Sequence, residues 1–235
     1  MSALCVIPAR GGSKRIARKN ARDFAGKPML AHALGAALAS GVFDTVHVST
    51  EDKEIAAIAA AYGAAPDFAR PADLADDHTP IRDVVKAVLA EYARRGRAFD
   101  TVALVYATAV LIEAEDLRAA LRAFEADPAR PLLSVVEAGT PLERLMVEEG
   151  GALKPALPER FANRTQDLTP AYRDAGAFGF FASETLRADT DGAAALAFRP
   201  FVLPLFKGVD IDTEDDWRFA EIIKAGRAAL SGETP

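Results

Sequence analysis

Short apolar runs alternate with helical patterns along most of this 235-residue chain. The runs at residues 3–7, 45–49 and 101–106 have the length and the apolar character of buried strands. Later strands are expected at 132–137, 177–181 and 201–205, and helices at 29–40, 52–62, 80–95, 114–125 and 214–230. Because this alternation is typical of repeated βαβ units, the sequence predicts an α/β fold around a mostly parallel sheet, with 201–205 as its last central strand.

The regular alternation is interrupted after residue 137. The pattern around Gly150-Gly151 predicts a hairpin over residues 144–154, and a proline-rich stretch follows as far as Pro158. We therefore expect one domain, residues 1–235, from which a segment at about 140–199 makes an excursion.

Charge and cysteine content exclude several classes of protein. The formal net charge is -6, and the basic residues that stand out are confined to one loop, which argues against general nucleic-acid binding. No apolar run approaches the length of a membrane span. The single cysteine, Cys5, lies in the first apolar run, so no disulfide framework is expected. We expect a cytoplasmic protein without nucleic-acid or membrane partners.

The first expected strand leads into a strongly basic, glycine-containing loop. Residues 10–22 carry six lysines and arginines and no acidic residue. Gly11 and Gly12 allow backbone N–H groups to approach phosphate oxygens, and the basic side chains add positive charge. The loop therefore predicts a polyphosphate site; the alternative is a solvated basic segment.

Two common nucleotide-binding motifs do not fit this loop. The dinucleotide fingerprint needs three glycines at fixed spacing, but only Gly11 and Gly12 follow the strand. A P-loop needs Ser or Thr after Gly-Lys, whereas Pro28 follows Gly26-Lys27. A Rossmann oxidoreductase and a P-loop kinase are both disfavoured.

The motif Ile7–Ile16, with Arg18-Lys19-Asn20 and Gly26–Met29, resembles the signature of the acylneuraminate cytidylyltransferases, the CMP-nonulosonate synthetases. The likeness continues through Val48–Asp52, Arg70-Pro71, Leu74–Asp77, Arg164–Leu168 and Asp210–Thr213 with Trp217. It therefore covers nearly the whole chain in order.

Within that family, Tyr106–Ala109 and Asp174–Gly176 are most similar to the branch that acts on pseudaminic acid. Ala17 and Val110 stand where the family usually has proline, and Ala177–Gly179 departs from the bulkier residues of that branch. Because Val110 and Ala177–Gly179 fall near the expected sugar pocket, the family is better indicated than the branch.

The resemblance implies a doubly wound sheet of the nucleotide-diphospho-sugar transferase type, with a protruding dimerisation segment. It implies a homodimer that transfers CMP from CTP to the anomeric hydroxyl of a nonulosonic acid and releases pyrophosphate, with Mg²⁺ as the cofactor. The residues implied to bind CTP are Ala9, Arg10, Gly11, Gly12, Ser13, Lys14, Lys19, Asn20, Arg70 and Asp77. The residues implied to bind the sugar are Tyr106, Thr108, Arg164, Gln166 and Asp174. The residues implied to be catalytic are Arg10, Lys14, Lys19, Asp210 and Asp212.

Asp210 and Asp212 are the expected magnesium ligands. They lie at alternate positions after an apolar strand, so both carboxylates can face one side, and hard oxygen ligands suit Mg²⁺. The alternative is that Asp212 or Thr213 caps the last helix. Asp210 lies too early in the chain to serve as a cap.

For several other residues, interpretations without a functional role stay open at this point. Lys19 could be a solvent-exposed charge, Arg70 an exposed loop arginine, and Tyr106 a core aromatic. Arg164 could form a surface ion pair with Asp167. Two alternative functions also stay open: another sugar nucleotidyltransferase, using a sialic, legionaminic or Kdo-type acid or another nucleotide, and a non-catalytic nucleotide-binding module.

Overall fold

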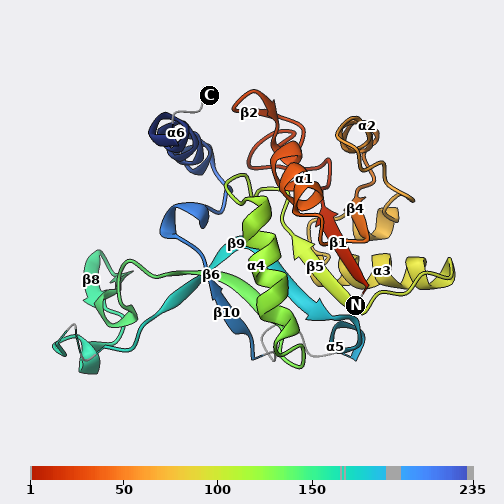
Figure 1. The fold of residues 1–235 in the computed structure, drawn as a ribbon. Helices are drawn as coiled ribbons and strands as arrows, with labels where there is room; N and C mark the ends of the chain where they lie inside the picture. Colours follow the sequence, from red (N-terminus) through yellow and green to blue (C-terminus); the bar gives the residue numbers. More distant parts are fainter. Residues whose placement is uncertain (1, 165, 167, 189–196, 232–235) are drawn as a thin grey trace.

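A computed structural model describes residues 2–164, 166, 168–188 and 197–231 (Figure 1). A six-stranded sheet in the order β10-β6-β9-β5-β1-β4 forms its centre. The strands are β1 Ala3–Pro8, β4 Thr45–Ser49, β5 Thr101–Val105, β6 Leu132–Glu137, β9 Tyr172–Ala182 and β10 Arg199–Val202. Only β9 runs antiparallel to its neighbours, and the other pairings are parallel. The predicted α/β fold with a mostly parallel sheet is confirmed.

β1 is apolar along its length because both of its faces are buried. Leu4 and Val6 pack into the hydrophobic cluster beneath α3, Ile81–Arg94. Cys5 and Ile7 pack into the opposite cluster. β1 is thus covered on both faces, and it lies between β5 and β4 in the sheet.

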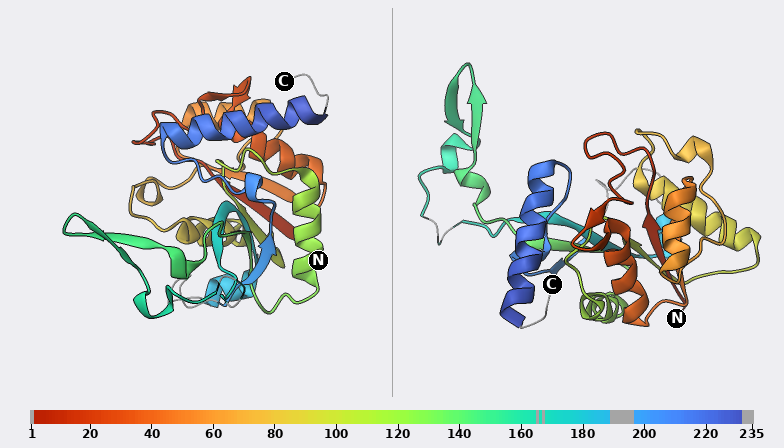
Figure 2. Two further views of the ribbon diagram at one scale, coloured as in Figure 1. Left: turned by 90° about the vertical axis from the view of Figure 1, so that its left-hand side faces the viewer. Right: turned by 90° about the horizontal axis from the view of Figure 1, so that it is seen from above.

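Helices cover both faces of the sheet (Figures 1 and 2). α1, Met29–Ser40, α2, Lys53–Ala61, and α4, Ala114–Glu125, supply apolar residues to one cluster. α3 and α5, Ser183–Ala188, lie on the other face. α6, Glu214–Ser231, follows the last strand, and single 3-10 turns occur at Ala72–Leu74, Leu142–Arg144, Pro158–Arg160 and Leu205–Lys207.

The last strand differs from the prediction. β10 spans Arg199–Val202 rather than 201–205, and it lies at the edge of the sheet. β9 inserts between β5 and β6 and takes the central place. Pro200 has no N–H to donate, which an edge strand tolerates better than a central strand.

The segment from 140 to 199 divides into two parts. β9 belongs to the central sheet, whereas the chain between β6 and β9 projects away from the body (Figure 2). The projecting part carries the predicted hairpin, formed by β7, Met146–Glu149, and β8, Ala152–Pro155. Gly150 and Gly151 join these strands with φ values of 62° and 77°, as a type I′ turn requires.

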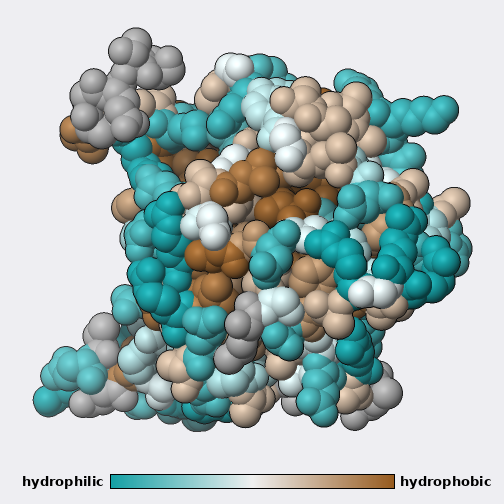
Figure 3. Space-filling model, turned by 45° about the vertical axis from the view of Figure 1, so that its right-hand side comes forward, coloured by the Kyte–Doolittle hydropathy of each residue, from teal (hydrophilic) through white to brown (hydrophobic). Residues whose placement is uncertain are grey.

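The surface is mixed in character. On the face seen in Figure 3, hydrophobic residues lie at the floor of a hollow and hydrophilic residues form much of its rim. None of the helices in the part of the chain that the structure describes is long and apolar enough to cross a membrane.

A third hydrophobic cluster joins the basic loop to the segment that precedes α6. Ile16 of the loop, Ile211 and Trp217 are all buried in it. Phe24 packs edge-on against Trp217, and Arg22 lies over the Trp217 ring. Two segments about 190 residues apart in sequence are thereby held side by side.

Two buried histidines are expected to make folding stability depend on pH. Burial lowers the pKa of both His32 and His47 from 6.5 to about 4. The unfolded chain binds protons more readily, so stabilisation is complete above pH 6.5 and is lost as pH falls towards 4. We expect each histidine to cost roughly 2 kcal/mol at pH 5.0 relative to pH 7.5. Urea unfolding at the two pH values measures the loss.

The control is the exposed His78. His32→Gln and His47→Gln should each reduce the difference in unfolding free energy between pH 7.5 and pH 5.0, and His78→Gln should leave it unchanged. An equal pH dependence in all three variants would show that other groups cause it.

Candidate active site

A cleft of about 360 Å³ opens at the carboxyl ends of β1 and β5. Open α/β sheets bind ligands at this edge. Most of the predicted site residues line it: Arg10, Ser13, Lys19, Asn20, Arg70, Asp77, Tyr106, Thr108, Asp210 and Asp212. Arg15 also lines the cleft. The structure thus brings the basic loop, the loop after α2 and the two late aspartates around one space.

The other predicted CTP residues lie beside the cleft. Ala9 is fully buried, and its N–H donates to the Ser49 carbonyl oxygen at 2.9 Å. The Gly11 N–H donates to Glu51 Oε1 at 2.8 Å, and Gly12 follows it in the same loop. Lys14 Nζ pairs with Asp77 at the rim.

Two predicted sugar residues lie elsewhere in the structure. Arg164 and Gln166 are exposed on the projecting segment and are not among the residues that line the cleft. Asp167 lies outside the described residues, so the alternative pairing of Arg164 with it is not tested.

Every basic side chain of the loop has a carboxylate partner. Arg10 and Lys14 pair with Asp77, Arg15 and Lys19 with Asp212, Arg18 with Asp52 and Glu54, and Arg22 with Glu214. Sequence analysis did not identify these ion pairs, because the partners lie 34 to 197 residues away in the chain. An incoming polyphosphate would compete with carboxylates for these cations.

Lys19 is an internal contact between the basic loop and the aspartate segment. Its side chain is 17% exposed, and Nζ donates to the Ile211 carbonyl oxygen at 2.5 Å. Asp212 Oδ1 lies 3.3 Å from the same Nζ. The alternative of a solvent-exposed charge is wrong.

Asp210 and Asp212 both line the cleft, while Ile211 between them is buried. Burial raises the pKa of Asp210, and the charge of Asp212 raises it further. Asp216 Oδ2 accepts from the Thr213 N–H at 2.8 Å, and Thr213 Oγ1 accepts from the Asp216 N–H at 3.2 Å. The helix cap is therefore Thr213, as one alternative held, and both aspartate carboxylates stay at the cleft.

Arg70 is a buried residue, with 7% of its surface exposed. Its guanidinium donates to Ser49 Oγ at 3.2 Å and to the Ser49 carbonyl oxygen at 2.5 Å. Burial lowers the pKa of Arg70, and the charge of Glu51 opposes that effect. The alternative of an exposed loop arginine is wrong, because the end of β4 holds the side chain in the cleft wall.

Tyr106 lies where the cleft meets β9. Burial raises the pKa of its hydroxyl to about 12, and the charges of Asp174 and Asp210 add to the effect. Asp174 Oδ1 accepts from the Gly176 N–H at 2.8 Å. Tyr106, Asp174 and Asp210 therefore share one electrostatic environment, although Asp174 is exposed beside the cleft.

Residues that sequence analysis missed hold the aspartate segment in place. Lys207, 8% exposed, pairs with Glu113 and Asp116 at the start of α4. Arg173 donates to the Gly208 carbonyl oxygen at 2.7 Å. No sequence signal identifies Lys207, since its partners lie 91 and 94 residues earlier.

Gly208 is expected to require its small size. A Cβ built there would lie 2.5 Å from Val136 Cγ1 and 3.4 Å from Ala175 Cβ, in the buried sheet. We expect Gly208→Ala to lower the free energy of unfolding by roughly 1–3 kcal/mol, as overpacking does. Gly226→Ala is the control for denaturant unfolding, because a Cβ there meets open space and alanine favours helix. Equal stability in the two variants would contradict the packing argument.

Comparisons with known proteins agree with this architecture. A family profile described as cytidylyltransferase matches residues 4–156. The pseudaminic acid cytidylyltransferase of Campylobacter jejuni subsp. jejuni (serotype O:2) is 38% identical over 228 residues, which are 95% of this chain and 96% of that protein. The CMP-N,N'-diacetyllegionaminic acid synthase of Legionella pneumophila is 31% identical over 94% and 95% of the two chains. A solved structure of CMP:2-keto-3-deoxy-manno-octonic acid synthetase, complexed with CTP, superimposes with a TM-score of 0.72 at 18% identity, covering 97% of this chain and 100% of that one.

Proposed function

Because this chain belongs to the cytidylyltransferase family, we propose that it transfers CMP from CTP to the anomeric hydroxyl of a nonulosonic acid, pseudaminic acid. The hydroxyl oxygen attacks the α-phosphorus, the bond to the β-phosphate oxygen breaks, and pyrophosphate leaves while the hydroxyl proton is released. One observation carries the proposal: Arg10, Lys19, Asp210 and Asp212 face a single cleft.

The basic side chains bind the triphosphate and stabilise the departing pyrophosphate. Asp77 now bridges Arg10 and Lys14, so its carboxylate occupies the position that a phosphate oxygen would take. CTP binding exchanges that carboxylate for the triphosphate, so Asp77, which the resemblance implies to bind CTP, would instead hold the basic side chains before the nucleotide enters. Fixed positive charges then face the negative charge that develops in the transition state. Arg70, anchored by Ser49, lies at the proposed cytosine and ribose side.

Asp210 and Asp212 fit a hard divalent cation such as Mg²⁺. Asp210 lines the cleft close enough to Asp212 for the two charges to interact, and no described side chain or N–H group donates a hydrogen bond to it. Two carboxylates with room for phosphate oxygens and water match the ligand set that Mg²⁺ prefers. When bound, Mg²⁺ would neutralise charge on the phosphates and lower the pKa of the attacking hydroxyl.

Tyr106, Thr108 and Asp174 lie at the cleft end where we place the sugar. Arg164, with Gln166, would bind the sugar carboxylate, since a guanidinium suits a planar carboxylate. Both residues are on the projecting segment. They can bind the sugar only if that segment reaches the cleft of its own chain or of a second copy.

We expect a homodimer formed through the projecting segment. Leu142, Val147 and Leu153 leave 51%, 50% and 68% of their surface exposed there. Val147 pairs with Lys154 and Leu153 with Glu148, so the apolar side chains lie on both faces of the hairpin, and a second copy can bury them. Sedimentation should give about twice the chain mass for the wild type and a lighter species for the double variant Val147→Asp, Leu153→Asp. A wild-type monomer at all concentrations would exclude the dimer.

The direct test incubates the protein with Mg²⁺, a panel of nonulosonic acids and CTP, UTP, ATP or GTP in turn. Pyrophosphate release and the mass of the CMP-linked product are the readouts. Pseudaminic acid with CTP should be the fastest pair. Preference for legionaminic acid would change only the assignment of the sugar, and activity only with another nucleotide would end the cytidylyl assignment.

We place the reaction in the cytoplasm, where the free thiol of Cys5 stays reduced.

A further inference from the structure

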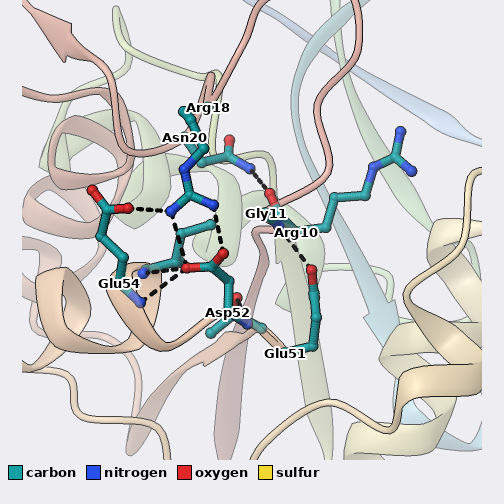
Figure 4. Close-up of polar contacts among 9 residues, drawn as sticks. Arg10, Gly11, Arg18, Asn20, Glu51, Asp52 and Glu54 are labelled. Atoms are coloured by element: carbon teal, nitrogen blue, oxygen red, sulfur yellow. Dashed lines mark hydrogen bonds and ion pairs between the residues drawn. The ribbon is translucent and has the colours of Figure 1, made fainter.

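Two arginines of the basic loop, Arg18 and Arg22, are not among the residues that line the cleft, and Arg22 pairs with Glu214 beside Trp217. Arg10, Arg15 and Lys19 do line the cleft. Figure 4 shows Arg18 directed towards the junction of β4 and α2, while the Arg10 side chain extends in another direction. Arg18 has a φ of 53°, a conformation that residues other than glycine seldom adopt. The Arg18 carbonyl oxygen accepts from the N–H groups of Ala21 and Arg22, both at 2.9 Å, and these bonds together with the side-chain contacts offset the strain.

Three acidic residues at that junction bind the loop through hydrogen bonds and ion pairs. We call Glu51, Asp52 and Glu54 the carboxylate bracket. The Arg18 guanidinium donates to Asp52 Oδ2 at 2.6 Å and to Asp52 Oδ1 at 3.2 Å, and it also pairs with Glu54. The Gly11 N–H donates to Glu51 Oε1 at 2.8 Å. The bracket thus holds the loop at two points, on either side of Lys14.

Asp52 both caps α2 and pairs with Arg18. Its Oδ1 accepts from the N–H groups of Glu54 and Ile55 at 2.9 and 3.1 Å, which caps α2. Hydrogen bonding to Arg18, more than the helix cap, lowers the pKa of Asp52 to about 2, so the carboxylate stays charged. Its Oδ2 also lies so close to Gly11 that a Cβ there would overlap it. The position of Gly11 is therefore set against the end of a rigid helix.

We propose that Asp52 and Arg18 are positioning residues that hold the basic loop in the shape that binds the triphosphate, without contacting the nucleotide. The inference rests on the proposed nucleotide site. Binding energy would be lost in any variant that frees the loop, because the loop would then have to be ordered by the ligand. Arg18 would thus act on affinity through Gly11 and Arg10.

Asp52→Ser tests the proposal, because serine keeps the helix cap and removes one of the two carboxylates that pair with Arg18, leaving Glu54. We expect the dissociation constant for CTP with Mg²⁺, measured by calorimetry, to rise about tenfold, the loss of one charge-assisted contact. The KM for CTP should rise equally, kcat should change less than threefold, and the thermal midpoint should change little. Asp127→Ser is the matched control, since it removes a similar arginine pair, with Arg130, outside the cleft.

A double-mutant cycle separates positioning from direct contact. Arg18→Met should weaken CTP binding at least as much as Asp52→Ser, because it also loses the pair with Glu54. The double variant should bind no more weakly than Arg18→Met alone, because the Asp52 contact is already broken there. If Arg18 touched the triphosphate, Arg18→Met would cost the same in both backgrounds, and the proposal would be overturned. Arg18→Met leaves the helix cap intact, so the proposal can still be tested with this variant if Asp52→Ser folds poorly.

The outcomes also separate this inference from the proposed function. A wild-type protein that binds CTP, with unchanged binding in Asp52→Ser and Arg18→Met, would overturn the positioning role alone. A wild-type protein that fails to bind CTP would overturn both. Because calorimetry with CTP and Mg²⁺ needs no sugar, a wrong sugar assignment does not affect the result.

Discussion

Asp210→Asn is expected to lower kcat on the order of 10³-fold, the scale seen when a group that stabilises transition-state charge is removed. Asparagine keeps the size of the side chain and removes the charge beside Asp212. The proposed Mg²⁺ site would then have one carboxylate, while the basic loop, which we propose binds the triphosphate, is untouched. We therefore expect the dissociation constant for CTP to change far less than kcat. Steady-state rates of pyrophosphate release and calorimetry measure the two quantities.

The matched control is Asp215→Asn. Its carboxylate is 92% exposed in the first turn of α6, and it pairs only loosely with Arg218 at 3.6 Å. Removing that charge should change kcat by less than twofold, because screened surface pairs contribute little. If Asp210→Asn retained the wild-type rate, the metal assignment of both aspartates would be wrong.

Lys207→Met is expected to lower the free energy of unfolding by about 3 kcal/mol, the scale for removing one partner of a buried ion pair. Lys207 is 7% exposed in its side chain, and Asp116 opposite it is 14% exposed. Methionine fills the space but leaves Asp116 without its cation. The change should also slow turnover, because Lys207 anchors the chain three residues before Asp210.

Lys154→Met is the control for this effect. Lys154 pairs with Glu149 on the projecting hairpin, where both side chains are more than half exposed. Its loss should cost no more than about 1 kcal/mol. Equal denaturant midpoints for the two variants would mean that Lys207 does not anchor the aspartate segment.

Most of the fold was predictable because local patterns and packing agree. α4 and β6 occupy the predicted ranges, because the spacing of apolar residues within each element indicates both its type and its buried face. The position of β10 was not predictable. Whether a strand is central or at an edge depends on which other strand pairs with its neighbour, and here β9 comes between β5 and β6.

For the site, the sequence by itself determined the residue types: a basic glycine loop after the first strand, and two late aspartates on either side of a residue that is buried. Those types follow from the chemistry that a polyphosphate demands. Only the tertiary structure decided their partners. Asp77, Asp52 and Asp212 neutralise cations far away in the chain, and Lys207 fixes the aspartates through α4. Ion pairs act through space, so their members carry no common sequence pattern; the cluster around Ile16 and Ile211 brings the two segments together.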